Sequence, residues 1–200
     1  MTDEKRTYRK KRRAELEEQT RRRITESAVE LHGTLGPART SISAVAERAG
    51  VRRSTVYRHF PDEAALFDAC SAHWSADNPL PDLEAWARMV DPDERLRVAL
   101  DQLYAYYRRT EAMLSNLHRD EATVPTVQDR FARFHGFREA ARETLLRGRG
   151  ERGGARRRVR AALGHALAFT TWRSLTGDQG LDDRQAAELM RALVTAAGGR

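Results

Sequence analysis

The side chains with the most chemistry to offer lie close together, in a short run that ends near residue 60. Seven of its eight residues carry hydrogen-bond donors or positive charge: Arg52, Arg53, Ser54, Thr55, Tyr57, Arg58 and His59. Two further hydroxyl groups, Ser41 and Ser43, come shortly before it. Arginine pairs with the edge of guanine, and short hydroxyl side chains bond to bases or phosphates. The run therefore predicts contacts with a nucleic acid, although a solvated basic face on an ordinary helical hairpin would have the same composition.

The rest of the sequence offers no set of residues for catalysis or for holding a metal. None of the six histidines stands four residues from another, and no H-E-x-x-H motif occurs. No nucleophile elbow, paired carboxylates or glycine-rich phosphate loop after a strand stands out. We therefore predict no enzyme activity, no catalytic residue, no metal site and no cofactor.

The donor-rich run needs an element that presents it outward, and Gly50 supplies the necessary bend. Two short helices that meet at a steep angle need a tight turn, where glycine adopts the positive φ that other residues resist. The first short helix would follow an N-cap at Ser41, and the second would cover about residues 52–59. Val56 and Phe60 would fix the second helix to a core. This arrangement leaves the donors exposed, as a helix that enters a major groove requires.

Helical periodicity continues through the remaining chain, and no segment alternates as a strand does. The expected helices cover about residues 20–35, 42–49, 52–59, 62–74, 83–89, 93–110, 111–119, 126–147, 156–175 and 182–197. The glycine-rich segment 147–158 is expected to be a mobile loop. The predicted fold class is all-α.

Composition narrows the class of partner. The 200 residues carry a formal net charge of +7, and the isoelectric point is about 10.1. A basic balance favours nucleic acid or an anionic membrane. No apolar run is long enough to span a bilayer, and no signal-peptide core follows the charged N-terminus. A single cysteine, Cys70, excludes an intramolecular disulfide. We expect a cytoplasmic protein without a membrane partner.

Residues 1–19 are interpreted as a basic N-terminal arm. Its first fourteen residues contain seven basic side chains against two acidic ones: Lys5, Arg6, Arg9, Lys10, Lys11, Arg12 and Arg13 against Asp3 and Glu4. Two alternatives stay open: a solvated tail or frayed helix extension, and an arm that follows a phosphate backbone or enters a minor groove.

The stretch "TRRRITESAVELHGTLGPARTSISAVAERAGVRRSTVYRHFPDEAALFDAC", from Thr20 to Cys70, resembles the N-terminal domain of the TetR family of transcriptional regulators. The most specific parts are "AERAGV", "STVYRHF" and "DEAAL". The resemblance implies a three-helix helix-turn-helix DNA-binding domain at residues 20–74 and a helical ligand-binding and dimerisation domain at 75–200. It also implies a homodimer that places two recognition helices in successive major grooves of double-stranded DNA.

The resemblance implies roles for single residues as well. Arg53, Thr55, Tyr57 and His59 would lie in the recognition helix, with Thr55 and Tyr57 at phosphates or thymine methyl groups. Ser43 would reach a base edge or phosphate, and Arg52 or Arg53 would pair with guanine.

Three residues depart from the family pattern. Arg52 occupies a position that is often an N-capping serine, which puts a firm start of the helix in doubt. Glu63 replaces a common phosphate-binding lysine, and its carboxylate would repel the DNA backbone. His32 replaces a frequent core aromatic residue and is interpreted as a partly buried packing residue.

Beyond residue 75 the sequence indicates a ligand cavity and a dimer interface in outline only. The candidate lining residues are mostly aromatic, which suits a flat, apolar small molecule: Trp86, Tyr104, Tyr107, Met113, Leu117, Phe134, Phe137, His165, Phe169 and Trp172. Taken singly, each is as well explained as core. The segment 156–175 is apolar on two sides, which indicates two partners, so a homodimer through the last two helices is predicted, with an intramolecular bundle as the alternative.

These observations predict a ligand-responsive, sequence-specific DNA-binding regulator, in the form of a repressor released from a palindromic operator by an unknown small-molecule effector. The coupling would pass through the helix at 62–74. One alternative is an architectural or nonspecific DNA-binding protein without an effector. Another is an all-α enzyme with an accessory helix-turn-helix.

Overall fold

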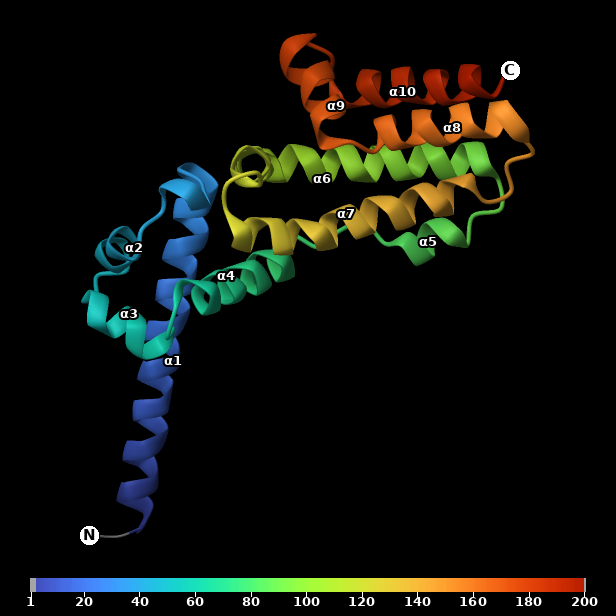
Figure 1. The fold of residues 1–200 in the computed structure, drawn as a ribbon. Coiled ribbons are helices and arrows are strands. Elements are labelled where there is room, and N and C mark those ends of the chain that lie inside the picture. The colour runs from blue at the N-terminus through green and yellow to red at the C-terminus, as the bar shows by residue number, and fades with distance from the viewer. Residues whose placement is uncertain (1–2, 200) are drawn as a thin grey trace. The chain divides into compact units, whose positions relative to one another are not determined.

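The computed structural model describes residues 3–199, and the surroundings of side chains at 7–129 and 131–199. Helices account for all the regular structure in this part of the chain, which confirms the all-α prediction (Figure 1). Ten α-helices follow one another: α1 (Asp3–Thr34), α2 (Ile42–Arg48), α3 (Arg53–His59), α4 (Glu63–Asp77), α5 (Leu83–Ala87), α6 (Pro92–Asp120), α7 (Pro125–Leu146), α8 (Gly153–Ala166), α9 (Phe169–Arg173) and α10 (Asp183–Gly198). Short turns of helix lie at Pro37–Arg39 and Ser174–Asp178.

The chain forms two compact units. Unit 1 comprises Met1–Asp77 and Ser115–Gln128, and unit 2 comprises Asn78–Leu114 and Asp129–Arg200. The sequence placed a domain boundary near residue 74 and assigned everything beyond it to one domain. Unit 1 instead takes in a distant segment, the end of α6 and the start of α7.

The core of unit 1 gathers apolar side chains from its four N-terminal helices: Ile24, Ala28, Ile42, Val45, Ala46, Ala49, Val56, Phe60, Leu66 and Cys70. The cap predicted at Ser41 is confirmed, and Asp62 supplies a second one. The hydroxyl of Ser41 accepts a hydrogen bond from the Ala44 amide at 3.2 Å, and the carboxylate of Asp62 accepts one from the Ala65 amide at 2.7 Å. These caps satisfy amide groups that the first turn of a helix otherwise leaves unpaired.

The distant segment joins unit 1 through a cluster of polar side chains at the end of α6, which we call the Asn116–Asp120 cluster: Asn116, Arg119 and Asp120. The amide of Asn116 donates to the carbonyls of His32 and Gly33 at 3.0 and 2.8 Å, and Arg119 donates to the carbonyl of Leu35 at 2.8 Å. The end of α6 therefore supplies hydrogen-bond donors to the otherwise open C-terminal carbonyls of α1.

Gly36 lets this cluster come close. Its φ of +93° is in a region that favours glycine, and a Cβ there would overlap the guanidinium of Arg119. The carboxylate of Asp120, only 3% exposed, accepts from the Ala38 amide at 3.0 Å and from Nε of Arg119 at 2.8 Å. Burial alone would raise the pKa of Asp120, but Arg119 and the Ala38 amide outweigh it and hold the pKa below its ordinary value.

Asp120→Ala is expected to lower the free energy of unfolding by about 2 kcal/mol, because it leaves the Ala38 amide and the buried side of Arg119 without their acceptor. Asp120→Asn, which keeps one acceptor oxygen, should cost less. Because the folded pKa is lowered, the carboxylate contributes fully above its ordinary pKa of 3.8 and loses the contribution as pH falls through the folded value. Urea unfolding at pH 7 and below pH 4 measures both effects. Equal stability of Asp120→Ala and the parent chain at pH 7 would contradict this account.

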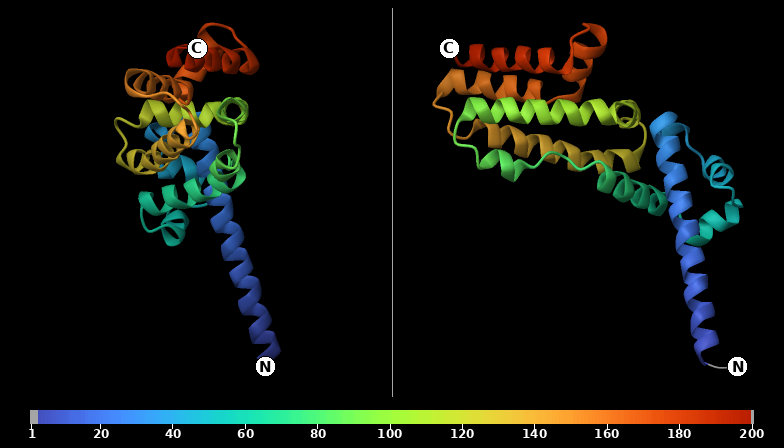
Figure 2. Two further views of the ribbon diagram at one scale, coloured as in Figure 1. Left: turned by 90° about the vertical axis from the view of Figure 1, so that its right-hand side faces the viewer. Right: turned by 180° about the vertical axis from the view of Figure 1, so that it is seen from behind.

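Unit 2 is a layered bundle in which α8 and α10 lie side by side, as both views of Figure 2 show. Its largest buried side chains are aromatic, among them Trp86, Tyr104, Tyr107 and Trp172. Arg95 is also buried, and its guanidinium donates to the carbonyls of Met89, Thr144 and Arg147.

Several predicted helix boundaries were wrong. The first helix begins at Asp3 rather than near Thr20, the segments 93–110 and 111–119 form the single helix α6, and the expected loop 147–158 is shorter because α8 begins at Gly153. The segment 156–175 was predicted as one helix but breaks between α8 and α9. Two tyrosine hydroxyls explain the break: Tyr104 donates to the Ala166 carbonyl at 2.9 Å and Tyr107 to the Leu167 carbonyl at 2.6 Å. These bonds replace the helical partners that the two carbonyls lack at the break.

Candidate nucleic-acid interface

The turn between α2 and α3 has the conformation that the sequence predicted. Gly50 has a φ of +62°, and a Cβ placed on it would meet no atom within 4 Å, so the requirement for glycine is conformational rather than one of space. The amides of Gly50 and Val51 donate back to the carbonyls of Glu47 and Ala46 at 3.0 and 2.9 Å. The last turn of α2 is thus closed, and the chain turns directly into α3.

Helix α3 has one buried and one exposed side. Val56 within it and Phe60 just after it are buried in the core of unit 1, as expected. The exposed side chains are Arg52, Arg53, Ser54, Tyr57 and Arg58, whereas Thr55 and His59 are half-buried. Arg52 makes no capping hydrogen bond, which agrees with its having no acceptor to offer. The exposed side of α3 therefore presents three arginines and no acidic residue.

Arg53 and Tyr57 hold each other on this exposed side. The guanidinium of Arg53 donates to the Tyr57 hydroxyl at 3.1 Å and lies 5.5 Å from the centre of its ring. The pKa of Arg53 is raised, first by that hydrogen bond and also by the nearby negative charge of Glu63. The contact with Tyr57 restricts the side chain of Arg53 on the exposed side of α3.

His59 differs from its neighbours because it turns partly inward. Its Nε2 atom is buried and has no hydrogen-bond partner within residues 3–199. Burial, and then the charges of Arg58 and Arg21, lower its pKa, so the ring is neutral at pH 7. His59 thus offers a neutral hydrogen-bonding ring rather than a cation for a phosphate.

Arg21 is a positioning residue that the sequence reasoning missed. From α1 it donates to the carbonyl of His59 at 2.8 Å, and its guanidinium lies 4.3 Å from the centre of the Phe60 ring. It therefore attaches the end of α3 to α1. The sequence does place Arg21 one helical turn before Ile24, the first core residue of α1. Its hydrogen-bond partner, His59, is 38 positions away, so the contact could not be recognised from local spacing.

The two serines at the start of α2 are both exposed. The Ser41 hydroxyl accepts from the Ala44 amide as the cap of α2, which leaves its hydrogen to donate, and Ser43 lies in the first turn.

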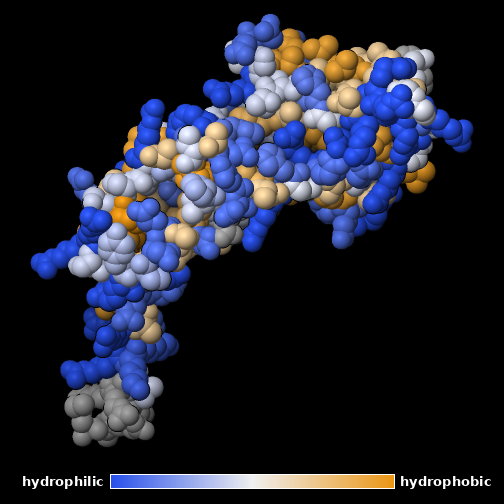
Figure 3. All heavy atoms as spheres, in the orientation of Figure 1, coloured by the Kyte–Doolittle hydropathy of each residue, from blue (hydrophilic) through white to orange (hydrophobic). Residues whose placement is uncertain are grey.

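The basic N-terminal arm is a helical extension of α1. Every residue from 7 to 19 is exposed, and this part of the molecule is blue almost throughout in Figure 3. A helix about 10–12 Å across does not enter a minor groove about 6 Å wide. The arm therefore has the form of the solvated helix extension, and of the two ways of contacting DNA only the one along the phosphates is compatible with a helix.

The residues predicted to line a ligand cavity form a packed aromatic cluster in unit 2. The Tyr107 ring lies at its centre, 5.4 Å from Phe169, 5.7 Å from Trp172 and 6.4 Å from Phe134 between ring centres. Two predicted members lie elsewhere. Leu117 belongs to unit 1, and His165 is exposed, with its Nδ1 atom 3.1 Å from the Thr171 hydroxyl.

The remaining predicted residues, Trp86, Tyr104, Met113 and Phe137, lie in unit 2, where Phe137 is half-buried and the other three are buried. The rings of Trp86 and Phe137 are tilted against each other with their centres 6.2 Å apart, and Tyr104 stacks on Tyr107 with the ring centres 6.2 Å apart. Because these rings occupy the space between the helices, a ligand that enters the cluster has to displace side chains.

The apolar faces at the C-terminal end are buried and exposed in a different pattern from the one predicted. The segment 156–175 has two apolar sides, and their members are buried within unit 2 apart from Thr170, so the pattern needs no second chain: Val159, Leu163, Ala166 and Thr170 on one side, and Ala162, Phe169 and Trp172 on the other. Helix α10 instead carries an unpartnered stripe: Leu189 is 46% and Leu193 40% exposed, with exposed Ala192 and Ala196 beside them. Orange spheres gather over α9 and α10 in Figure 3. The stripe has the spacing of a helix–helix contact.

Two other classes of site were searched in the described part of the chain. Residues 3–199 contain no group of three histidine, cysteine, aspartate or glutamate side chains placed to hold a metal ion. None of the helices described combines the length and the apolar character needed to cross a membrane.

A family model and solved structures match this arrangement. Residues 24–70 match the model described as "Bacterial regulatory proteins, tetR family". A putative TetR-family transcriptional regulator from Mesorhizobium loti superposes with a TM-score of 0.63 at 18% identity, over 90% of this chain and 96% of its own. NalD, the secondary repressor of the MexAB-OprM multidrug efflux pump in Pseudomonas aeruginosa, gives 0.59 at 22% identity, over 92% and 97%.

A putative fatty acid metabolism regulator from Clostridium perfringens gives a TM-score of 0.63 at 16% identity, over 88% of this chain and 97% of its own. No curated protein sequence matches the chain. At these identities the structural matches establish the fold, and the match at residues 24–70 identifies the helix-turn-helix.

Proposed function

We propose that this chain, whose residues 24–70 match the model of the tetR family of bacterial regulatory proteins, is a homodimeric repressor. In this proposal it binds a palindromic operator with two copies of α3 and leaves it when a small-molecule effector binds unit 2.

The observation that carries the proposal is the exposed side of α3. It holds Arg52, Arg53 and Arg58 without an acidic neighbour on the helix, and Val56 and Phe60 anchor it from behind. A rigid helix with exposed arginines is the means by which helix-turn-helix proteins read base edges in the major groove. The pairing of Arg53 with Tyr57 supports a role for Arg53 in recognition of the base sequence rather than in nonspecific attraction to the DNA backbone.

Selection of bound duplexes from a random pool tests the proposal. We expect an enriched palindrome whose half-sites are about 34–36 Å apart, or a multiple of that spacing, because two-fold symmetry in the protein is mirrored in the DNA. Binding without an enriched sequence would instead support a nonspecific DNA-binding protein. The exposed basic arm on α1 is the feature that favours this second candidate.

The proposed effector site is the aromatic cluster around Tyr107, which a flat apolar molecule would enter by moving rings aside. Helix α6 is the proposed route of coupling, since its first part belongs to unit 2 and its last residues form the Asn116–Asp120 cluster in unit 1. The sequence predicted the helix at 62–74 as the route of coupling, and the Asn116–Asp120 cluster favours α6 instead. An effector that binds unit 2 but leaves operator affinity unchanged contradicts this coupling.

Arg53→Ala is expected to weaken operator binding by about 1–3 kcal/mol per half-site and to relax the preference at one base position. Arg88→Ala, which changes an exposed arginine of unit 2, is the matched control and should change neither quantity. Affinities for the selected operator and its single-base variants measure both effects. Uniform weakening on every sequence would assign Arg53 to a phosphate instead.

A further inference from the structure

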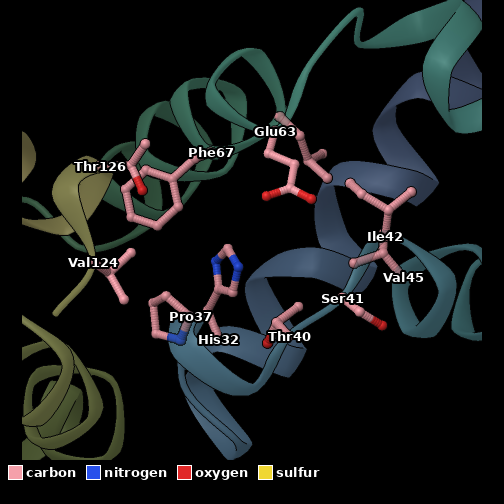
Figure 4. A pocket seen from close by; sticks show the side chains of 11 residues that line it. His32, Pro37, Thr40, Ser41, Ile42, Val45, Glu63, Phe67, Val124 and Thr126 are labelled. Atoms are coloured by element: carbon pink, nitrogen blue, oxygen red, sulfur yellow. The ribbon is translucent and has the colours of Figure 1, made fainter.

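A cavity of about 80 Å³ lies inside the DNA-binding unit, behind the start of α2, and we call it the His32 cavity. Its lining comes from five segments that are all in unit 1 (Figure 4): His32, Pro37, Thr40, Ser41, Ile42, Val45, Glu63, Leu66, Phe67, Val124 and Thr126. One buried water needs roughly 10–15 Å³ of such space, so the cavity has room for several waters or for one small organic molecule.

His32 turns a polar ring onto this space (Figure 4). Its ring centre is 5.3 Å from that of Phe67. Burial lowers the pKa of His32 to about 4, although Asp120 acts in the opposite direction, so the ring is neutral at pH 7. Because His32 is half-buried, its neutral ring offers one donor and one acceptor nitrogen to a molecule in the cavity.

Glu63 sets the charge of the cavity. It is the only charged side chain in the lining at neutral pH, because His32 is neutral and no lysine or arginine takes part. Its carboxylate is directed into the open space, towards the ring of His32 (Figure 4). Of the hydroxyl groups nearby, Ser41 accepts from the Ala44 amide and Thr40 donates to the Gly36 carbonyl at 2.8 Å. The net charge of the lining is negative, so the cavity attracts a cation.

The other walls are apolar and suit an apolar body. Pro37, Ile42, Val45, Leu66 and Phe67 surround the space between His32 and Glu63. We propose that the His32 cavity binds a small organic cation, with a protonated amine on the carboxylate of Glu63 and an apolar or aromatic body against Phe67. The neutral ring of His32 hydrogen-bonds the polar end. A pocket that is mostly apolar with few convergent polar groups is the usual form of a small-molecule site.

Occupation of the cavity has a consequence for DNA binding, which rests on the proposed function. Glu63 is an exposed carboxylate in the first turn of α4, in the same unit as α3. An amine that neutralises Glu63 removes a negative charge that would repel the phosphates of DNA bound by this unit. The bound amine thus favours operator binding, in contrast to an effector that releases the DNA.

Titration of the full chain with benzylammonium and butylammonium chloride tests the site without DNA. Methyl-labelled protein is observed by NMR, because Ile42, Val45, Leu66 and Val124 place methyl groups in the walls. We expect saturable shifts of these methyl signals for at least one of the two amines. Benzyl alcohol and benzoate, which match benzylammonium in shape but not in charge, should bind at least ten times more weakly.

Glu63→Gln should weaken amine binding at least ten-fold, and Glu84→Gln is the matched control because Glu84 is also an exposed glutamate in the first turn of a helix. His32→Phe should abolish binding by filling the cavity. Absence of saturable shifts with both amines, equal binding of benzyl alcohol, or unchanged binding by Glu63→Gln would each overturn the site.

With the selected operator at constant ionic strength, the binding amine should tighten DNA binding several-fold, and Glu63→Gln alone should do the same. If the random pool yields no palindrome, the NMR result still decides the cavity.

Discussion

A chain that begins after residue 14 is expected to lose much of its affinity for DNA and to show a flatter dependence on salt. The deleted segment carries seven basic residues and two acidic ones, and its described side chains lie exposed along the first turns of α1. Each phosphate contact contributes about 0.9 to the slope of log affinity against log salt. A dimer that loses about four contacts should therefore lose roughly 3–4 units of slope. Anisotropy titrations between 50 and 200 mM salt measure the change.

A charge-only variant separates the basic side chains from the helix that carries them. Glutamine at positions 9–13 removes five positive charges and keeps good helix formers throughout. If the charges act on phosphates, this variant should reproduce most of the change caused by the deletion. A slope equal to that of the parent chain, in either variant, would show that the arm does not contact DNA.

The sequence was most informative where local chemistry decides the structure. The positive φ of Gly50 and the cap at Ser41 were predicted because each depends on residues within a few positions. The exposed side of α3 followed from the same local pattern. Its half-buried members did not, because the inward turn of His59 depends on α1.

The sequence was least informative where partners are far apart in the chain. The break between α8 and α9 depends on Tyr104 and Tyr107, about sixty positions away, and the periodicity of 156–175 shows no sign of it. The Asn116–Asp120 cluster likewise joins two segments separated by more than eighty residues. The aromatic residues of unit 2 were recognised as a group, but their spacing was equally compatible with a cavity and with the packed cluster that forms.

The dimer prediction shows how the same conclusion can rest on a different observation. It was drawn from the two apolar sides of segment 156–175, which unit 2 buries by itself. The exposed stripe of α10 is now the observation that supports the dimer. Two leucines one turn apart, each 40% or more exposed, are costly to leave in water, and a second copy of the same helix would cover them by two-fold symmetry.

Leu189→Arg combined with Leu193→Arg is expected to convert the proposed dimer into a monomer and to weaken operator binding by about 10²–10⁴-fold. Both side chains are exposed within the chain, so the substitution should leave the monomer folded. The loss of affinity arises because a dimer gains its second half-site intramolecularly, whereas a monomer does not. Light scattering and operator titrations report the two quantities separately.

Val90→Arg is the matched control, since Val90 is 92% exposed and precedes α6, away from α10 in the sequence. It introduces the same charged side chain at an exposed apolar position and should leave both mass and affinity unchanged. A double variant of α10 that remains dimeric would place the interface elsewhere. A double variant that becomes monomeric but keeps full operator affinity would contradict the two-half-site mechanism while leaving the interface in place.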